Sequence, residues 1–246
     1  MNEVLSWKNH CVLQSDGRGG FVVRPGQLRF LPRSRDQQVW PFGLAKMDND
    51  EMVLAAIRRP PQGPPWIEQT LIAFSCDEGA TWSEYMEIPG CTGRPMMLAY
   101  LGEGALTFTA GWGKEIYRFF SQDYGRTWEE RIPLQPASDG RTFEVEGNPL
   151  VERPGKGTAT RIAETGATQE GGWPEHTSHA YIRSSRDGGR CWEDELSPPQ
   201  WRWEEAFNGK RYIRSVYEGA LVRAANGWLV AAIPCRARTA DRRELK

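Results

Sequence analysis

The chain has 246 residues, of which 39% are hydrophobic and 11% aromatic, enough apolar material for one folded domain with a sizeable core. Its 31 basic and 32 acidic residues give a net charge of −1, so we expect neither nucleic acid nor an anionic membrane surface as a partner. The N-terminus has no uninterrupted apolar run and no segment is long enough to span a bilayer. We therefore expect no signal peptide or membrane anchor, and a cytoplasmic location for the chain as written.

The cysteines predict neither a disulfide framework nor a zinc site, because their number is odd and none forms a C-x-x-C pair. His176 and His179 are spaced as metal ligands can be, but they have no third ligand nearby and fall in a Gly-rich stretch, so we expect no metal. No phosphate-binding loop is present, and no cofactor is expected. The five cysteines are Cys11, Cys76, Cys91, Cys191 and Cys235.

Short apolar runs separated by polar turns follow one another along the chain and predict hairpins. A hairpin around residues 16–20 is expected either as an extra element before the first blade or as part of a closing blade, and a further single strand is expected after each of the next three hairpins. The hairpins pair residues 41–45 with 52–56, 95–99 with 105–109, 147–151 with 159–163, and 219–222 with 228–232; the single strands cover 69–74, 115–120 and 180–184.

One eight-residue pattern, S-x-D-x-G-x-[T/C]-W, follows each of the three single strands. The Asp side chain can cap its own turn, the Gly supplies a positive φ, and the Trp opens the next strand and packs on a neighbouring layer. The pattern therefore predicts a structural turn and no chemistry of its own. The fixed residues are Asp77, Gly79 and Trp82; Asp123, Gly125 and Trp128; and Asp187, Gly189 and Trp192.

A unit of three strands, the turn and a fourth strand is typical of a β-propeller blade. We therefore predict an all-β fold in which residues 1–246 form a single propeller domain with about three and a half four-stranded blades, an incomplete ring. The blades are expected at about 38–92, 93–144 and 145–205, with the start of a fourth at about 212–233. Residues 164–176 are predicted as a Gly-rich loop, and the tail from Pro234 no longer follows the blade pattern.

The three turns and their placement resemble the Asp-box (BNR) repeats of the sialidase, or neuraminidase, superfamily of six-bladed propellers, over roughly Trp40 to Ala232. The resemblance implies a glycosidase that removes terminal sugars, with sialic acid as one candidate, and it implies a Tyr nucleophile polarised by a Glu, an Asp acid/base, and three arginines that hold the substrate carboxylate.

Carried over residue by residue, the resemblance makes Glu218 the candidate partner of the tyrosine and Arg236 a candidate for one arginine. The family's first arginine falls at Val39, which precedes Trp40 and Pro41, and is missing. The loop before the first box has no Asp, and Glu68 is its only acid. Arg58 and Arg59 lie at the start of that loop and are candidate substrate contacts.

The repeat itself also predicts a site, because the residue that opens each inner strand should face the centre of the propeller. These residues are Trp40, Arg94, Glu146 and Glu218. Arg94 and Trp40 could bind a sugar and the glutamates could act as acid or base, or the charges could form a purely structural ion-paired ring.

The function expected is thus a sialidase-like glycoside hydrolase or part of one. The alternatives are a non-catalytic propeller that binds a glycan or a protein, and a partial chain that self-associates through open blade edges.

Overall fold

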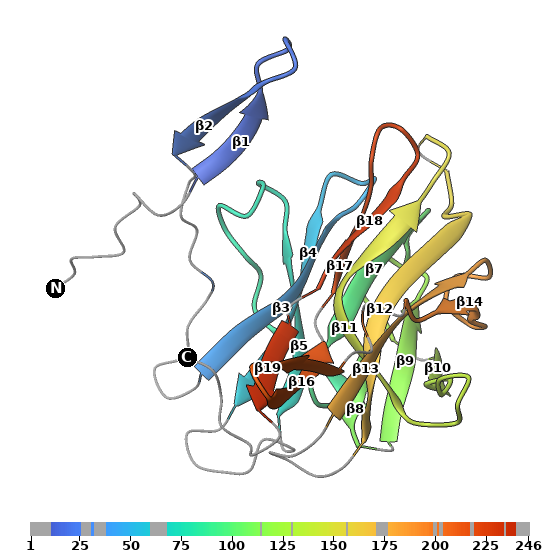
Figure 1. Cartoon of the computed structure of the whole chain (residues 1–246). Helices are drawn as coiled ribbons and strands as arrows, with labels where there is room; N and C mark the ends of the chain where they lie inside the picture. Colours follow the sequence, from blue (N-terminus) through green and yellow to red (C-terminus); the bar gives the residue numbers. More distant parts are fainter. Residues whose placement is uncertain are drawn as a thin grey trace, which may run out of the picture.

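The computed structural model describes residues 11–25, 31, 38–59, 68–113, 115–128, 130–155, 157–170, 177–198, 201, 204–216, 219–233 and 235–239. These residues form strands β1 to β19 with no α-helix among them (Figure 1). Within this part of the chain there is accordingly no helix with the length and apolar character needed to cross a membrane.

The first two blades are regular four-stranded antiparallel sheets in which each strand pairs with the next along the chain. In each sheet the middle strands are buried at consecutive positions along most of their length, and most of these positions are apolar, so the pattern does not alternate. The first sheet contains β3 (Gln38–Lys46), β4 (Met52–Arg59), β5 (Gln69–Ser75) and β6 (Met86–Thr92), and the second β7 (Met96–Gly102), β8 (Ala105–Trp112), β9 (Glu115–Ser121) and β10 (Glu130–Pro133).

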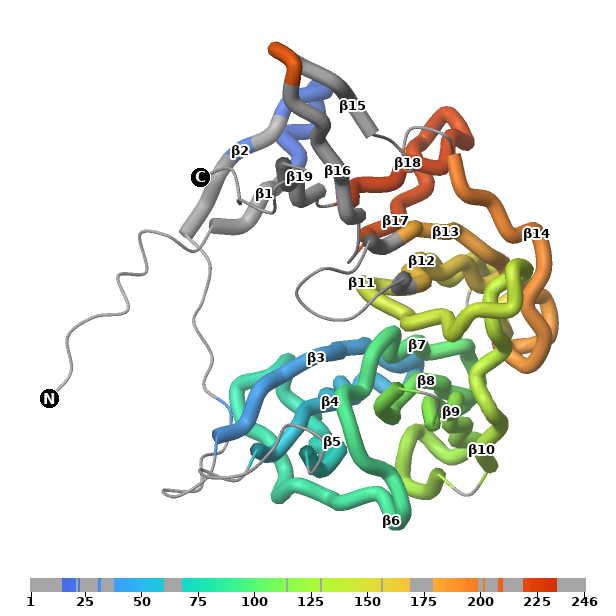
Figure 2. The backbone as a smooth tube through the Cα atoms, turned by 60° about the horizontal axis from the view of Figure 1, so that its bottom comes forward, coloured from blue at the N-terminus to red at the C-terminus, as the bar shows by residue number. Residues whose placement is uncertain are grey.

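The third blade is joined at its inner strand to a two-stranded hairpin. Its strands are β11 (Phe143–Glu152), β12 (Arg161–Glu170), β13 (Thr177–Ser185) and β14 (Glu193–Leu196), and the hairpin is β17 (Ala220–Arg223) with β18 (Leu229–Ala232). A parallel pairing of Asn148 with Ala220 links β11 to β17. Figure 2 shows the three blades and the hairpin side by side in an arc around a common centre. The prediction of an all-β propeller with about three and a half blades is confirmed.

The approach of the hairpin to the third blade requires glycine. Gly147 has φ +87°, and a Cβ atom at this position would lie 1.7 Å from the carbonyl oxygen of Gly219. Thr165 Oγ1 lies 2.8 Å from the carbonyl oxygens of both Glu146 and Gly219, which share its single hydroxyl hydrogen. These contacts fix the start of β17 against the middle of β11.

Three stretches differ from the sequence interpretation. Residues 164–170 were expected in a loop but form most of β12, which pairs with β13 along its length because the small residues of Thr165–Thr168 fit a buried central strand. Strands β15 (Glu204–Phe207) and β16 (Lys210–Val216) pair with each other in a separate sheet, apart from the third blade and the β17–β18 hairpin. β19 (Cys235–Thr239), in the tail expected to leave the blade pattern, completes that sheet beside β16.

β1 (Cys11–Ser15) and β2 (Phe21–Pro25) form the N-terminal hairpin.

The three S-x-D-x-G turns share one hydrogen-bond pattern, except that in the third the Cys191 amide donates to both oxygens of Asp187, where the first two turns also have a Thr hydroxyl bond. In the first, Ser75 Oγ donates to Asp77 Oδ1 at 2.8 Å, and the amide of Thr81 and its hydroxyl donate to the two carboxylate oxygens at 2.8 and 2.6 Å. The amide of Gly79 donates to Ser75 Oγ at 2.8 Å. Corresponding bonds recur at Asp123 and Asp187, and Gly79, Gly125 and Gly189 all have positive φ.

Arginines of the second and third turns join each blade to the one before it. Arg126 lies 3.6 Å over the ring of Phe74 and donates to both oxygens of Glu51 in the first blade. Arg190 lies over Phe120 and pairs with Glu130 in the second blade. The first turn has Ala80 at this position. The core lies between blades in the same way, since one cluster joins the first and second blades and another the second and third.

The carboxylates of the three turns should make the free energy of unfolding depend on pH in the acidic range. Hydrogen bonds from the Thr81 hydroxyl and amide lower the pKa of Asp77 from 3.8 to about 2. Because the folded pKa lies below the unfolded one, this stabilisation is present above about pH 4 and is lost as the pH falls toward 2. We expect Asp77→Asn to flatten the fall of the free energy of unfolding over that interval, measured by urea titration at several pH values. Thr81→Val removes one of these hydrogen bonds, so the fall in the free energy of unfolding should occur at higher pH. If Asp77→Asn depends on acid as strongly as the wild type does, the assignment is wrong.

Candidate functional site

A small cavity of about 150 Å³ lies between the second and third blades, at the end of β8 and beside β11. Its charged lining comes from Arg94, Glu144 and Glu146, and its aromatic lining from Phe42 and Trp112. The structure therefore brings together two of the four residues predicted to face the centre, Arg94 and Glu146. Trp40 lies outside this lining, and Glu218 falls outside the described residues.

The two glutamates lie on one face of β11. Along Phe143–Glu146 the side chains alternate, with Phe143 and Val145 in the core between the blades and Glu144 and Glu146 toward the cavity. Sequence reasoning named Glu146 and missed Glu144. The alternation F-E-V-E was the signal that could have found it, because it places both carboxylates on the face opposite the apolar pair.

Burial raises the pKa of Glu144 above its usual 4.5, and the neighbouring positive charge of Arg94 opposes that rise. A carboxyl group in this condition keeps its proton to a higher pH than an exposed one. The cavity thus holds a carboxyl suited to donating a proton, beside a second carboxyl two residues along the same strand.

Arg94 is held from several directions. Its guanidinium carbon lies 5.2 Å from the centre of the Trp112 ring and 5.9 Å from that of Phe42. Its Nε atom lies 3.5 Å from Glu68 Oε2. The residue before it, Gly93, donates its amide to the carbonyl of Glu68 at 2.8 Å. The direction of Arg94 is therefore set by the first blade as well as by the second.

The buried Glu68 pairs with the partly exposed Arg59 beside Arg94. Glu68 has no exposed area, and Arg59 Nε donates to its Oε1 atom at 2.8 Å, with a second bond from Arg59 Nη2. The guanidinium of Arg59 also lies 4.9 Å from the centre of the Trp40 ring, and Trp40 is 46% exposed. Glu68, predicted as a catalytic acid, is thus buried, with Arg59 and Arg94 as its charged neighbours.

Arg58 is directed away from Arg59, as alternation along β4 requires. It donates to Gln69 Oε1 at 3.0 and 2.7 Å and pairs with Glu87 on the outer strand β6. The backbone of Arg236 pairs with Ser215 in the β15–β16–β19 sheet, and its side chain lies outside the described part of the structure. Among the described residues no cluster of three His, Cys, Asp or Glu could hold a metal ion.

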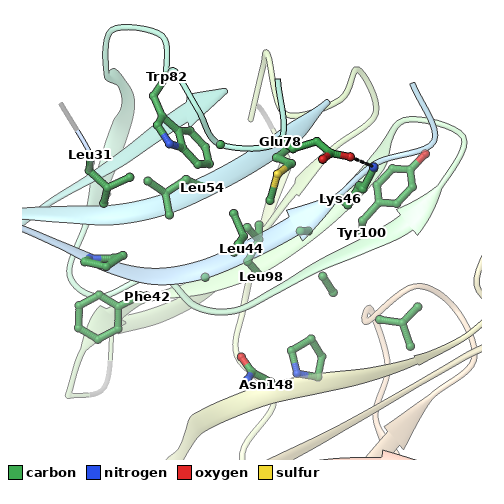
Figure 3. Close-up of a pocket in the computed structure, with 18 of the residues that line it drawn as sticks. Leu31, Phe42, Leu44, Lys46, Leu54, Glu78, Trp82, Leu98, Tyr100 and Asn148 are labelled. Atoms are coloured by element: carbon green, nitrogen blue, oxygen red, sulfur yellow. Dashed lines mark hydrogen bonds and ion pairs between the residues drawn. The ribbon is translucent and has the colours of Figure 1, made fainter. Parts of the chain in front are cut away.

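A larger cavity of about 790 Å³ runs along β3, with Leu44, Trp82, Leu98 and Asn148 in its lining (Figure 3). Lys46 and Glu78 at its edge are paired with each other at 3.4 Å, and both are largely exposed. Arg153, also in the lining, lies over the ring of Tyr100. The walls between them are mostly apolar, so the cavity offers space but no acid–base pair, and the smaller cavity is the better candidate for chemistry.

No protein-family model matches the chain, and no curated protein matches its sequence. Among solved structures, a glycosyl hydrolase from Bacteroides ovatus is 11% identical, with a TM-score of 0.52, over 96% of this chain and 76% of that one. A mutant of the GH43 protein BlXynB from Bacillus licheniformis is 13% identical, with a TM-score of 0.50, over 80% of this chain. The matched part is 36% of the length of the Bacillus protein.

At such low identities these likenesses show the fold alone: a β-propeller of the kind found in glycoside hydrolases. A leech intramolecular trans-sialidase is 15% identical with a TM-score of 0.38, over 68% of this chain and 33% of that one, which is too distant to carry an argument. The comparisons thus support a propeller of the glycosidase type and do not single out the sialidase superfamily.

Proposed function

We propose that this chain carries the sugar-binding centre of a propeller glycoside hydrolase that acts on terminal sugars. The observation that supports it is the pair Glu144 and Glu146 on one face of β11, beside Arg94, with the pKa of Glu144 raised by burial. Cleavage of a glycosidic bond commonly uses one carboxyl group as proton donor and a second as base or nucleophile, and the burial that raises the pKa of Glu144 favours the donor role for that residue.

In this proposal Glu144 protonates the leaving oxygen and Glu146 acts as base or nucleophile. Trp40 offers an exposed ring on which a sugar can stack, and Arg94 donates hydrogen bonds to sugar hydroxyls. The sialidase resemblance adds Glu218 as the partner of a tyrosine, and with it a sialoside as one candidate substrate.

Turnover of a panel of fluorogenic glycosides, with a sialoside and several neutral sugars, tests the proposal. We expect the full chain to cleave at least one of them and Glu218→Gln to slow that cleavage if the sialidase-type mechanism holds. If Glu218→Gln cleaves the glycoside as fast as the wild type, Glu144 and Glu146 remain the candidate catalytic groups. No turnover on any member, with Glu218→Gln indistinguishable from the wild type, would reject the hydrolase.

A second candidate function, glycan binding without hydrolysis, is favoured by two departures from the sialidase pattern. The arginine expected before Trp40 is missing, and the loop before the first box has no Asp to act as acid/base. Binding on a glycan array without turnover of the bound sugar would support this function, whereas turnover without measurable retention on the array would reject it.

A further inference from the structure

Both arginines near the candidate site are held by one buried carboxylate. Arg59 donates two N–H groups to Glu68 Oε1, and Arg94 Nε lies 3.5 Å from Glu68 Oε2. Glu68 has no exposed area, while the side chains of Arg59 and Arg94 are 26% and 45% exposed. The carboxylate therefore lies behind the two cations, on the side away from solvent.

An incoming anion would compete with Glu68 for the positive charge of Arg94, whose Nε atom faces Glu68 Oε2. Glu68 Oε2 makes no hydrogen bond within the described structure, so the Arg94 cation is the group that offsets its charge there. If Arg94 turned to a ligand carboxylate, a buried carboxylate oxygen would lose its partner, which is costly in a site away from water. Arg59 likewise offsets the charge of Glu68, and its guanidinium also lies over the ring of Trp40.

The described charges of the site contain no positive excess. Arg59 and Arg94 contribute two positive charges, and Glu68 and Glu146 contribute two negative ones. Glu144 adds a third negative charge whenever it is ionised. Arg58, the next cation along the chain, is paired with Glu87 and is directed away from the site. Among the described residues of the site, a carboxylate-bearing sugar would thus enter beside two or three carboxylates, and both arginines there already have Glu68 as a charged neighbour.

We propose that Glu68 determines the sugar specificity of this site: by holding Arg59 and Arg94 it makes the site select uncharged sugars over sugars that carry a carboxylate. The inference rests on the proposed sugar-binding function and gives it a substrate class. It also opposes the expectation from the sialidase resemblance, in which arginines are available to grip a substrate carboxylate.

Matched pairs of sugars that differ in charge test this specificity by calorimetric titration. The probes are methyl glucoside against methyl glucuronide, methyl galactoside against methyl galacturonide, and lactose against sialyllactose. We expect the wild type to bind the neutral member of its best pair about tenfold more tightly. Glu68→Gln removes the negative charge behind the arginines, so the ratio should fall about tenfold and become sensitive to NaCl.

Glu87→Gln is the matched control, because it removes a carboxylate that pairs with Arg58 outside the site, and it should leave the ratio unchanged. Melting curves show whether Glu68→Gln folds; if it does not, Arg59→Gln removes one cation instead and should strengthen the preference for neutral sugars. A wild-type preference for the acidic members, or an unchanged ratio in a folded Glu68→Gln, would overturn the inference.

The outcomes separate this inference from the proposed function. Selective binding of neutral sugars without turnover keeps the specificity and rejects hydrolysis. Turnover that favours the sialoside keeps hydrolysis and rejects the specificity. No binding of any probe by the wild type rejects the sugar-binding function, and the specificity inference with it.

Discussion

Replacing Glu164 with glutamine should lower the free energy of unfolding by about 3–5 kcal/mol, the range measured when one member of a buried ion pair is removed. Glu164 lies on β12, and its two carboxylate oxygens accept hydrogen bonds from Arg118 at 2.7 Å and Arg183 at 2.8 Å. All three side chains are at most 1% exposed. The variant would leave two buried guanidinium groups without their counter-charge, and burial already lowers the pKa of Arg118.

Denaturant unfolding measures this loss, and Glu193→Gln provides the control. Glu193 pairs with Arg186 at 2.9 Å, but both side chains are more than half exposed, so its removal should change the free energy of unfolding by about 0–1 kcal/mol. A loss below about 1 kcal/mol for Glu164→Gln would show that the triad does not hold the second and third blades together.

Glutamine in place of Glu144 should reduce kcat/KM for a cleaved glycoside by about 10²–10⁴-fold, the usual contribution of a positioned acid. Because burial raises the pKa of Glu144, the protonated form persists to a higher pH, and activity that needs it should fall as the pH rises through that pKa. The variant cannot lose this proton, so the alkaline fall in the pH–rate profile should disappear together with most of the rate.

The control for this variant is Glu152→Gln, at the far end of the same strand. Glu152 pairs with Arg223 and lies outside the cavity lining, so its replacement should leave kcat/KM within about threefold of the wild type. Glu144→Gln could instead keep the wild-type kcat/KM and the fall in rate at alkaline pH, while Glu146→Gln loses both. In that case the acid role belongs to Glu146. If both variants keep their rates, the β11 pair is not catalytic.

The repeated pattern was sufficient to predict the blades because the information for each turn is local. The Ser, Asp, Gly and Thr or Cys of a turn bond with one another within a few residues, so their spacing alone indicates the turn. The order of strands in a blade is equally local, since each strand of the three blades pairs with its neighbour in the chain.

The candidate site was only partly predictable. The repeat brought Arg94 and Glu146 together in the sequence interpretation, but it could not show that Glu68 would be buried beside Arg94, because that pair joins the residue before β5 to a residue shortly before β7. The interpretation of residues 164–170 as a loop failed for a related reason. A charged residue and a glycine suggest a loop by composition, whereas Glu164 is accommodated in a central strand by two arginines from other strands.

The sequence alone therefore determined an all-β propeller of four-stranded blades, the position of its turns, and two of the residues that line the candidate cavity, since all of these follow from short-range patterns. Only the tertiary structure decided which charges compensate one another: Glu68 with Arg59 and Arg94, and Glu164 with Arg118 and Arg183. The physical reason is that the effect of a charge depends on its burial and on its partners across strands and blades, neither of which spacing along the chain specifies.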